Sequence, residues 1–368
     1  MAHSVIDTPT LGEADNRYGP TAARLVSTEP IRLGTVTVDC HAHIFVPEAA
    51  KYIAPHYDPA ARPFVKYSSP QTRAINLKQD ADRTLALLDP RDRVRVLDAQ
   101  GIDIQIVSPA PPQCYYDVPK EHGRTVSRIV NEGVATFVAT HPERFAGLGT
   151  IPLQDPAAAV SELEFVIGTL GFRGVEILTN VNGTELSSAE FDPVWAKASE
   201  IGAVVMLHPL GFTEARRFED YYFTNVIGNP LDTTVALHHL IFGGVLERHP
   251  GLKILAVHGG GFLPAYSGRI DHAWGARADA RGSLPEPPSS YLAKMYFDTT
   301  VFTSHQLEYL VRQYSSDHIL MGTDYPYDMA EYYPLQHIVS AAALSDREKT
   351  NVAGESSVRF FGLSPRRT

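Results

Sequence analysis

Residues 35–45 read TVTVDCHAHIF, an alternating apolar run that ends in two histidines two positions apart. Alternate side chains of a β-strand point to the same face, so His41 and His43 would face the same way. Imidazole is the commonest metal ligand in proteins, so the pair could be half of a metal site or simply a polar strand end. The spacing alone leaves both interpretations open.

The composition is that of an ordinary soluble globular protein. The 368 residues are 44% hydrophobic and 20% charged, with a formal net charge of −10 at pH 7. This balance argues against nucleic-acid binding, which requires a basic surface. No apolar run reaches the roughly 18 residues of a membrane span, and the N-terminus lacks a signal-peptide pattern. Two cysteines make no disulfide framework, so we expect a cytoplasmic protein.

Eight short β-rich runs recur along the chain, with helical patterns between them. The runs span residues 35–43, 102–108, 144–152, 172–178, 202–209, 252–260, 293–300 and 317–326. The helical patterns span residues 91–101, 121–145, 155–171, 187–202, 231–251, 304–315 and 335–361. Eight strands that alternate with helices predict a closed (β/α)8 TIM barrel. An open doubly wound sheet is the alternative, although it would normally show a glycine-rich loop after an early strand.

Two segments fall outside this alternation. Residues 1–30 form a polar N-terminal arm, either disordered or docked on a neighbouring subunit, and residues 31–368 form the barrel domain. Residues 44–90 are rich in proline, tyrosine and charge, and they are too long for a plain loop. We therefore expect an insertion after the first strand, which would cover the barrel as a subdomain or lid.

Chemistry-bearing residues gather at the predicted carboxyl ends of the strands, where barrel enzymes place their active sites. His208 ends the fifth strand, His258 ends the sixth, and Asp324 follows the eighth in GTDYP. Together with His41 and His43 they suit a zinc ion that keeps one coordination position open. Each also has a structural interpretation, for example His208 as a core histidine and Asp324 as a helix cap.

Two further residues lie beside these strand ends. Asp298, near the end of the seventh strand, is expected to orient a ligating imidazole rather than bind the metal itself. Cys40 points to the opposite face of the first strand from His41, so we interpret it as a packing residue.

Several motifs resemble the amidohydrolase-related decarboxylases. They are VDCHAHIF, ERFAGLGTIPLQDP, LGFRGVEI, the HP pair after strand five, GGVLERHPGLKILAVHGGGFLPAYSGRIDHAW and ILMGTDYPY. The resemblance runs from about residue 36 to residue 362. Within this family the sequence most resembles the α-amino-β-carboxymuconate-ε-semialdehyde decarboxylases, whose relatives include the γ-resorcylate and 5-carboxyvanillate decarboxylases.

The resemblance implies a metal site and a catalytic residue. His41, His43, His208 and Asp324 would bind one divalent ion, zinc in the muconate type and manganese in some relatives, with no organic cofactor. His258 matches the catalytic histidine of the family, which contacts the metal-bound water.

The resemblance also implies how a substrate carboxylate is held. Arg269 matches an arginine that reaches the site of a neighbouring subunit, which implies a homodimer or a higher homo-oligomer. The end of the fourth strand, at Glu176, offers no lysine for a carbamate bridge, so one metal is favoured over two.

Some substrate contacts stay open. A second substrate arginine would lie in the insertion, where Arg83 and Arg73 are both candidates. Tyr115 and Tyr116, in the loop after the second strand, could stack on a substrate ring or pack against the insertion.

These features predict a metal-dependent, non-oxidative decarboxylase of an unsaturated or aromatic carboxylic acid, a small-molecule substrate of aromatic catabolism. Two routes stay open, because His258 could activate the metal-bound water or Asp324 could protonate the substrate carbon before CO₂ leaves. The alternatives are a hydrolase or hydratase that acts on a lactone, amide or ring-fission product with the same metal site, and a metal-binding protein without catalytic activity.

Overall fold

Eight parallel strands form one sheet in the order β1–β2–β3–β4–β7–β8–β9–β10 in the computed structural model, which describes residues 29–364. The strands are Val38–Ile44 (β1), Ile104–Pro109 (β2), Phe145–Thr150 (β3), Gly174–Leu178 (β4), Val204–His208 (β7), Lys253–Ala256 (β8), Tyr296–Asp298 (β9) and Ile319–Leu320 (β10). A two-stranded hairpin, Asn180–Val181 (β5) and Thr184–Glu185 (β6), follows β4.

The sheet closes where the segment after β10 meets β1. Ala42 forms a parallel bridge with Tyr325, whose carbonyl oxygen accepts from the backbone nitrogen of His43 at 2.8 Å. The backbone nitrogen of Asp324 donates to the carbonyl oxygen of His41 at 2.7 Å. The predicted (β/α)8 barrel is therefore confirmed, and the open-sheet alternative is wrong.

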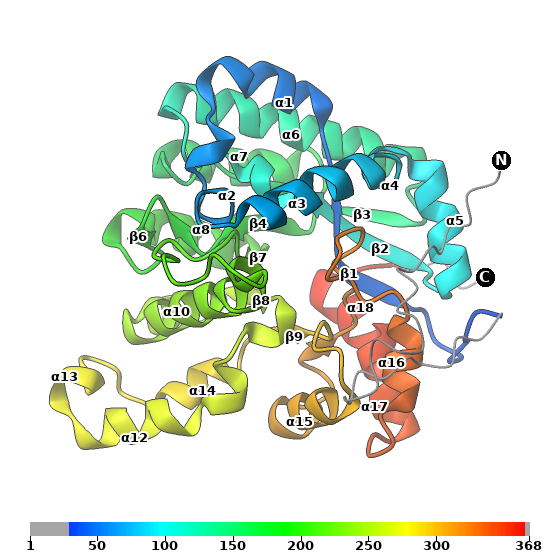
Figure 1. Cartoon of the computed structure of the whole chain (residues 1–368). Coiled ribbons are helices and arrows are strands. Elements are labelled where there is room, and N and C mark those ends of the chain that lie inside the picture. Colours follow the sequence, from blue (N-terminus) through cyan, green and yellow to red (C-terminus); the bar gives the residue numbers. More distant parts are fainter. Residues whose placement is uncertain (1–28, 365–368) are drawn as a thin grey trace.

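Helices surround this barrel (Figure 1). Those between the strands are Pro90–Gln100 (α5), Lys120–Thr140 (α6), Pro156–Gly168 (α7), Asp192–Ile201 (α8), Phe223–Val226 (α9), Gly228–Phe242 (α10), Val245–Arg248 (α11) and Ser304–Tyr314 (α15). A separate group, Gly268–Ala276 (α12), Ala278–Arg281 (α13) and Pro288–Leu292 (α14), lies between β8 and β9. The chain ends with Pro334–Ser340 (α16), Asp346–Thr350 (α17) and Ser356–Phe361 (α18). None of the helices in the described residues is long and apolar enough to cross a membrane.

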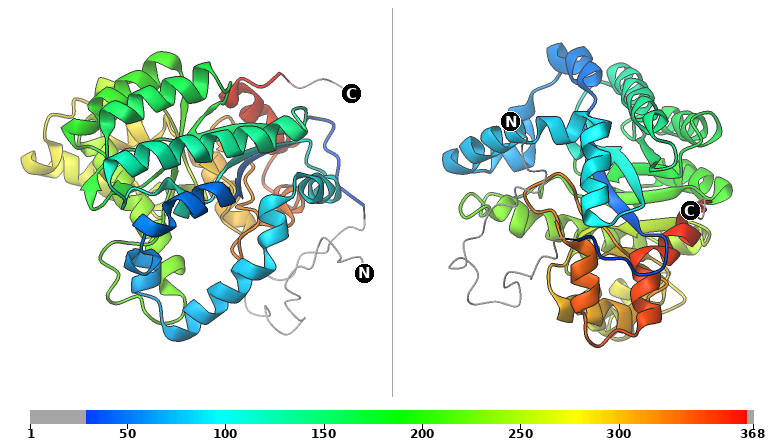
Figure 2. Two further views of the ribbon diagram at one scale, coloured as in Figure 1. Left: turned by 90° about the horizontal axis from the view of Figure 1, so that it is seen from above. Right: turned by 90° about the vertical axis from the view of Figure 1, so that its right-hand side faces the viewer.

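Four helices fill the segment between β1 and α5, where the sequence predicts an insertion. They are Pro47–Ile53 (α1), Pro63–Lys66 (α2), Pro70–Asp82 (α3) and Thr84–Leu88 (α4). The first three begin at a proline, which suits the first helical position because its missing N–H has no partner there in any case. Figure 2 shows these blue helices gathered on one side of the barrel.

The inserted helices meet loops from the carboxyl ends of the strands. The backbone nitrogen of Ser69 donates to the carbonyl oxygen of Glu219, in the loop after β7. The guanidinium of Arg83 lies 4.0 Å from the carboxylate of Asp328, in the loop after β10. The division into an arm, a barrel domain and an insertion stays a prediction, and residues 1–28 of the arm lie outside the described residues.

Three predicted boundaries were wrong. The helix expected over residues 231–251 is two helices, because Gly243 and Gly244 break it and Gly244 has a left-handed φ of +70°. The eighth strand keeps only two regular residues, since the chain after Leu320 turns toward β1. Residues 261–292, for which no element was predicted, contain α12 to α14.

The barrel interior has an apolar floor below a polar mouth. The floor is built by side chains from β1, β2, β3, β7, β8, β10 and α18: Val38, Cys40, Ile106, Leu148, Val204, Met206, Leu255, Val257, Leu320, Phe360 and Phe361. The β1–β2 register shifts between Asp39 and Ala42, so Cys40 packs into the floor although His41 also faces the interior. Cys40 is a packing residue, as expected, but the expectation that it points to the opposite face of the strand from His41 is wrong.

Candidate metal centre

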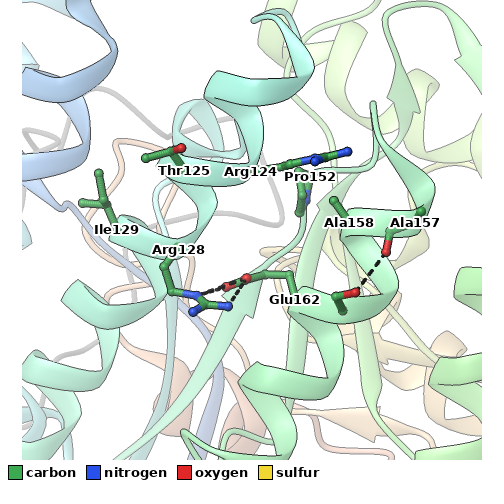
Figure 3. Close-up of a pocket in the computed structure, with 9 residues that line it drawn as sticks. Arg124, Thr125, Arg128, Ile129, Pro152, Ala157, Ala158 and Glu162 are labelled. Atoms are coloured by element: carbon green, nitrogen blue, oxygen red, sulfur yellow. Dashed lines mark hydrogen bonds and ion pairs between the residues drawn. The ribbon is translucent and has the colours of Figure 1, made fainter.

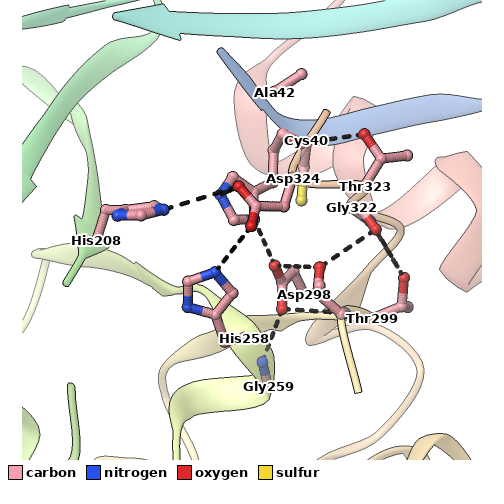
Figure 4. Close-up of polar contacts among 12 residues, drawn as sticks. Cys40, Ala42, His208, His258, Gly259, Asp298, Thr299, Gly322, Thr323 and Asp324 are labelled. Atoms are coloured by element: carbon pink, nitrogen blue, oxygen red, sulfur yellow. Dashed lines mark hydrogen bonds and ion pairs between the residues drawn. The ribbon is translucent and has the colours of Figure 1, made fainter. Parts of the chain in front are cut away.

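Four side chains converge at the mouth of the barrel. His41 and His43 come from β1. His208 ends β7, and Asp324 follows β10 (Figure 4). One ligand atom from each lies within 4.8 Å of all the others, and all four residues are buried. The structure thus brings together the four residues that the sequence predicted as metal ligands.

The spacing of these atoms fits a single ion. The Nε2 atoms of His41 and His43 are 3.1 Å apart. Asp324 Oδ1 lies 3.2 Å from His43 Nε2, 3.4 Å from His41 Nε2 and 3.9 Å from His208 Nε2. Ligands held at about 2.0–2.1 Å around a tetrahedral zinc ion are about 3.3 Å from one another. The donor set and its spacing therefore match what a divalent ion requires.

The imidazole rings are oriented by groups behind them. His41 Nδ1 donates to Asp298 Oδ2 at 2.7 Å, and His43 Nδ1 lies 3.1 Å from the carbonyl oxygen of Pro109. His208 Nδ1 lies 2.7 Å from the carbonyl oxygen of the following residue. Because all three partners are acceptors, the protons belong on Nδ1 and the Nε2 lone pairs face the centre.

One of these nitrogen atoms lacks a hydrogen-bond partner within residues 29–364. Among the described residues, His208 Nε2 is buried and makes no hydrogen bond. Buried polar atoms without a partner are rare in folded proteins and are costly. A cation bound between the four side chains would give the His208 Nε2 lone pair the partner that it lacks.

The electrostatics of the centre favour positive charge. Burial raises the pKa of Asp324, but the neighbouring histidines, His41 first, outweigh burial and hold it well below its usual range. Burial also lowers the pKa of His43, yet the carboxylates of Glu176 and Asp324 raise it to about 10. Burial lowers the pKa of His208 to about 4, which keeps this ring neutral. The raised pKa of His43 means that the centre stabilises positive charge, and a metal ion bound at Nε2 would take the place of that proton.

Asp298 lies behind an imidazole, as expected. Besides His41, its carboxylate accepts from the backbone nitrogen of Gly259 at 2.7 Å and from the hydroxyl of Thr300 at 2.9 Å. These bonds fix the carboxylate, and the carboxylate fixes the ring of His41.

His258 stands beside the four residues without joining them. Its Nε2 lies 3.4 Å from Asp324 Oδ2, the oxygen turned away from the other histidines, and its side chain is 16% exposed. Both residues adopt left-handed backbone, with φ of +55° for His258 and +60° for Asp324. Non-glycine residues hold such angles at a free-energy cost and are concentrated at functional sites.

The structure separates the two arginine candidates of the insertion. The guanidinium of Arg83 lies 4.8 Å from the ring centre of Tyr327, and that ring is 5.3 Å from the ring of His43. Arg73 is exposed and donates to the carbonyl oxygen of Ser68. Only Arg83 therefore reaches the neighbourhood of the centre.

The other predicted substrate residues lie farther out. Tyr115 is buried, with its ring 5.3 Å from that of Tyr57. Tyr116 is buried and lines a cavity of about 230 Å³ at the carboxyl ends of β4 and β7. Arg269 is exposed on α12, apart from the four converging residues. Substrate binding by these three residues stays a prediction.

A second cavity, of about 630 Å³, opens between α6 and α7 on the outer surface (Figure 3). Its charged groups neutralise each other, since Arg128 pairs with Glu162 at 2.8 Å and Arg124 pairs with Asp155. It includes none of the residues at the strand ends. The chemistry is concentrated in the barrel mouth.

The sequence places Glu176 at the end of the fourth strand but predicts no role for it in this mouth. Glu176 is fully buried on β4, and its Oε2 lies 3.4 Å from His43 Nδ1. The signal was available, because an ionisable side chain inside the buried run GVEIL needs a partner.

Comparison with known proteins places the chain in a family. The amidohydrolase family model matches residues 38–363. A 2-amino-3-carboxymuconate-6-semialdehyde decarboxylase of Dictyostelium discoideum is 34% identical over 278 residues, which is 75% of this chain and 77% of that protein. The crystal structure of 5-carboxyvanillate decarboxylase from Sphingomonas paucimobilis has a TM-score of 0.79 and 26% identity, covering 90% of this chain and 100% of that one.

A further solved structure carries a bound metal. It is a 5-carboxyvanillate decarboxylase from Novosphingobium aromaticivorans, solved with manganese and 4-hydroxy-3-methoxy-5-nitrobenzoic acid. Its TM-score is 0.80 with 21% identity, and the alignment covers 92% of this chain and 99% of that one. At that identity the likeness concerns the fold alone.

The barrel fold and the cluster of three histidines and one aspartate are those of a metal-dependent barrel enzyme. The chain belongs to the amidohydrolase family. The family resemblance predicted from the sequence is thus confirmed, and the relatives described above are carboxy-lyases.

Proposed function

We propose that this protein is a metal-dependent, non-oxidative decarboxylase of an unsaturated or aromatic carboxylic acid. The observation that carries the proposal is the convergence of three imidazoles and one carboxylate at the barrel mouth, with His258 on the second oxygen of Asp324. The relatives support the reaction class, because their names describe decarboxylases. For the same reason a hydrolase or hydratase is not favoured.

We propose that His41, His43, His208 and Asp324 hold one divalent ion. Three imidazoles and a carboxylate suit zinc, whereas the manganese of the Novosphingobium protein makes manganese the alternative. A bound ion would supply a Lewis acid that withdraws electron density from substrate oxygen atoms.

The reaction requires a proton at a defined place. Decarboxylation breaks the bond between the carboxyl group and its carbon atom, leaves the electron pair on that carbon, and replaces CO₂ by a proton. Asp324 Oδ2 and His258 Nε2, 3.4 Å apart, are the groups that can share this proton. The solvent exposure of His258 supports renewal of the proton after each turnover.

The substrate carboxylate needs a cation. Arg83 is suited to this role, because its side chain is only 9% exposed and its carboxylate partners, Asp80 at 3.7 Å and Asp328 at 4.0 Å, lie beyond hydrogen-bond distance. Its Nε and one terminal nitrogen donate to Gln79, so an incoming carboxylate would have to replace these bonds to be held by two hydrogen bonds.

We further propose a homodimer in which Arg269 of the partner subunit contributes a second cation. Its exposure on α12 supports this role, since an exposed arginine is free to reach another chain. Exposed aromatic side chains nearby, Phe262 at 46% and Tyr266 at 67%, support burial of this surface in an interface.

Two minor assignments complete the proposal. Tyr116, at the cavity of about 230 Å³, would shape the substrate pocket, and Tyr115 would hold that loop in place. A cytoplasmic location is supported by the two cysteines, which are both buried and free.

The test is CO₂ release from a panel that starts with the substrates of the related decarboxylases. We expect release to require a divalent metal and to fall by about 10²-fold or more in His258→Asn, the range of general acid–base catalysis, with unchanged metal content. The matched control is His305→Asn, an exposed histidine on α15, which should behave as the wild type.

Two results would contradict the proposal. One is purified protein that contains and binds no divalent metal. The other is His258→Asn protein that releases CO₂ as fast as the wild type on a confirmed substrate.

A further inference from the structure

A buried carboxylate lies behind one of the imidazole rings of the centre, on the side of its Nδ1 atom. Glu176 lies on β4, with Val175 and Ile177 turned outward into the core between strands and helices. Alternate side chains face opposite ways, so Glu176 faces the barrel interior. It is fully buried, and its Oε2 lies 3.4 Å from His43 Nδ1.

Among residues 29–364, no arginine or lysine forms an ion pair with this carboxylate. In the part of the chain that the structure describes, the one ion pair of Glu176 is with His43. An unpaired buried carboxylate destabilises a fold by several kcal/mol. A negative charge on Glu176 therefore needs a nearby cation. A metal ion in the centre, on the opposite side of the His43 ring, would supply it.

The geometry excludes Glu176 as a direct ligand of the centre. It approaches Nδ1 of His43, whereas the opposite nitrogen, Nε2, faces His41 and Asp324. Its approach is also longer than that of two neutral acceptors, the carbonyl oxygen of Pro109 and the hydroxyl of Ser108, both at 3.1 Å. The neutral groups therefore orient the ring, and Glu176 acts mainly through its charge.

We propose that Glu176 is a positioning residue that strengthens metal binding by placing a negative charge behind His43, as Asp298 does behind His41. The negative charge makes the His43 ring a stronger donor at Nε2 and balances the ion. The inference rests on the proposed metal site and adds a residue to it. It also explains a glutamate within a strand that is otherwise apolar.

The experiment measures zinc affinity in metal-free protein by competition with a chelating dye. We expect Glu176→Gln to bind one ion per chain with an affinity about 10–100-fold weaker than wild type, as for other residues behind metal ligands. Glu176→Asp, which keeps the charge, should lie between the two. The control is Glu162→Gln, a buried glutamate on α7 held by Arg128 and Asn131, which should leave zinc affinity unchanged.

Thermal unfolding separates this role from a purely structural one. Without metal, Glu176→Gln should melt at the wild-type temperature or above, because the substitution removes an unbalanced buried charge. With zinc, its melting temperature should rise less than that of the wild type, because weaker binding stabilises less. Cobalt in place of zinc should give a shifted visible spectrum in Glu176→Gln.

Two outcomes would overturn the proposal. One is Glu176→Gln protein with wild-type zinc affinity. The other is a wild type that binds two ions where Glu176→Gln binds one, which would make Glu176 a bridging ligand. These measurements use no substrate, so a failure to release CO₂ would refute the decarboxylase assignment and leave the role of Glu176 standing.

Discussion

At the scale of single residues, the centre combines donors whose protonation is set by their neighbours. Asp298 and the backbone carbonyls behind His43 and His208 hold protons on Nδ1, so the Nε2 lone pairs converge. Strand-end spacing could predict His41, His43 and His208. It could not predict which nitrogen faces inward, because the orienting partners come from distant segments of the chain.

A buried carboxyl outside the centre gives a prediction about pH. Asp232 on α10 accepts from the hydroxyl of Thr179, and burial raises its pKa from 3.8 to about 7. The folded chain therefore holds a proton that the unfolded chain releases above about pH 4, so this group lowers stability progressively as the pH rises from about 4 to 7. Asp232→Asn, which can still accept from Thr179, removes that loss.

The measurement is denaturant unfolding of both proteins at pH 5 and pH 8. The stability gained by Asp232→Asn should grow by roughly 2–3 kcal/mol between these values, from about 1.4 kcal/mol per pKa unit. Asp279→Asn, an exposed carboxyl whose pKa is lowered by Arg277, should show no such growth. A pH-independent effect of Asp232→Asn would contradict the argument.

At the scale of elements, local sequence signals predicted most of the strands and helices. Asp155 followed by Pro156 is a local signal for the start of α7, and Gly101 is one for the end of α5, because capping and left-handed termination act within one turn. The inserted helices have few buried residues, so their sequences show no clear apolar stripe. The short hairpin β5–β6 was missed although its turn, Asn182–Gly183, is a recognised signal.

One glycine shows how closely two strands of the centre approach. A Cβ atom added at Gly174 would lie 2.0 Å from the carbonyl oxygen of Val204, its register partner on β7. Gly174→Ala should therefore push β4 from β7 and lower the free energy of unfolding by more than about 2 kcal/mol. Zinc affinity should fall as well, because these strands carry Glu176 and His208.

Thermal unfolding and dye competition measure both effects. Gly168→Ala, at the end of α7, is the matched control because an added Cβ there meets no atom within 4 Å. It should change stability by less than about 1 kcal/mol, the range of helix propensity. Equal melting temperatures for Gly174→Ala and Gly168→Ala would contradict the prediction, because they would mean that β4 and β7 accommodate the added Cβ atom without loss of packing.

At the scale of the whole molecule, the barrel places reactive groups at one end and leaves α12 to α14 apart from it (Figure 1). Arg269 lies on that group, outside the cluster formed by its own chain. A catalytic role for it therefore requires a second copy, in line with the closed symmetry of most homo-oligomers.

Mixed dimers test that arrangement once a substrate is known. Arg269→Ala should lose CO₂ release while keeping its metal, and His208→Ala should lose both. Dissociation and random reassociation of the two in equal amounts should restore about a quarter of wild-type activity, because half of the dimers gain one intact site. An absence of recovery, with dimers present by sedimentation, would place Arg269 outside the site of the partner.

The sequence by itself determined the barrel class and the candidate ligands, because these depend on short-range periodicity and on residues at strand ends. Only the tertiary structure decided between Arg83 and Arg73, assigned His258 to the second oxygen of Asp324, and placed Glu176 behind His43. Those relations join segments that lie many residues apart along the chain. They depend on strand register and helix packing, which no local pattern records.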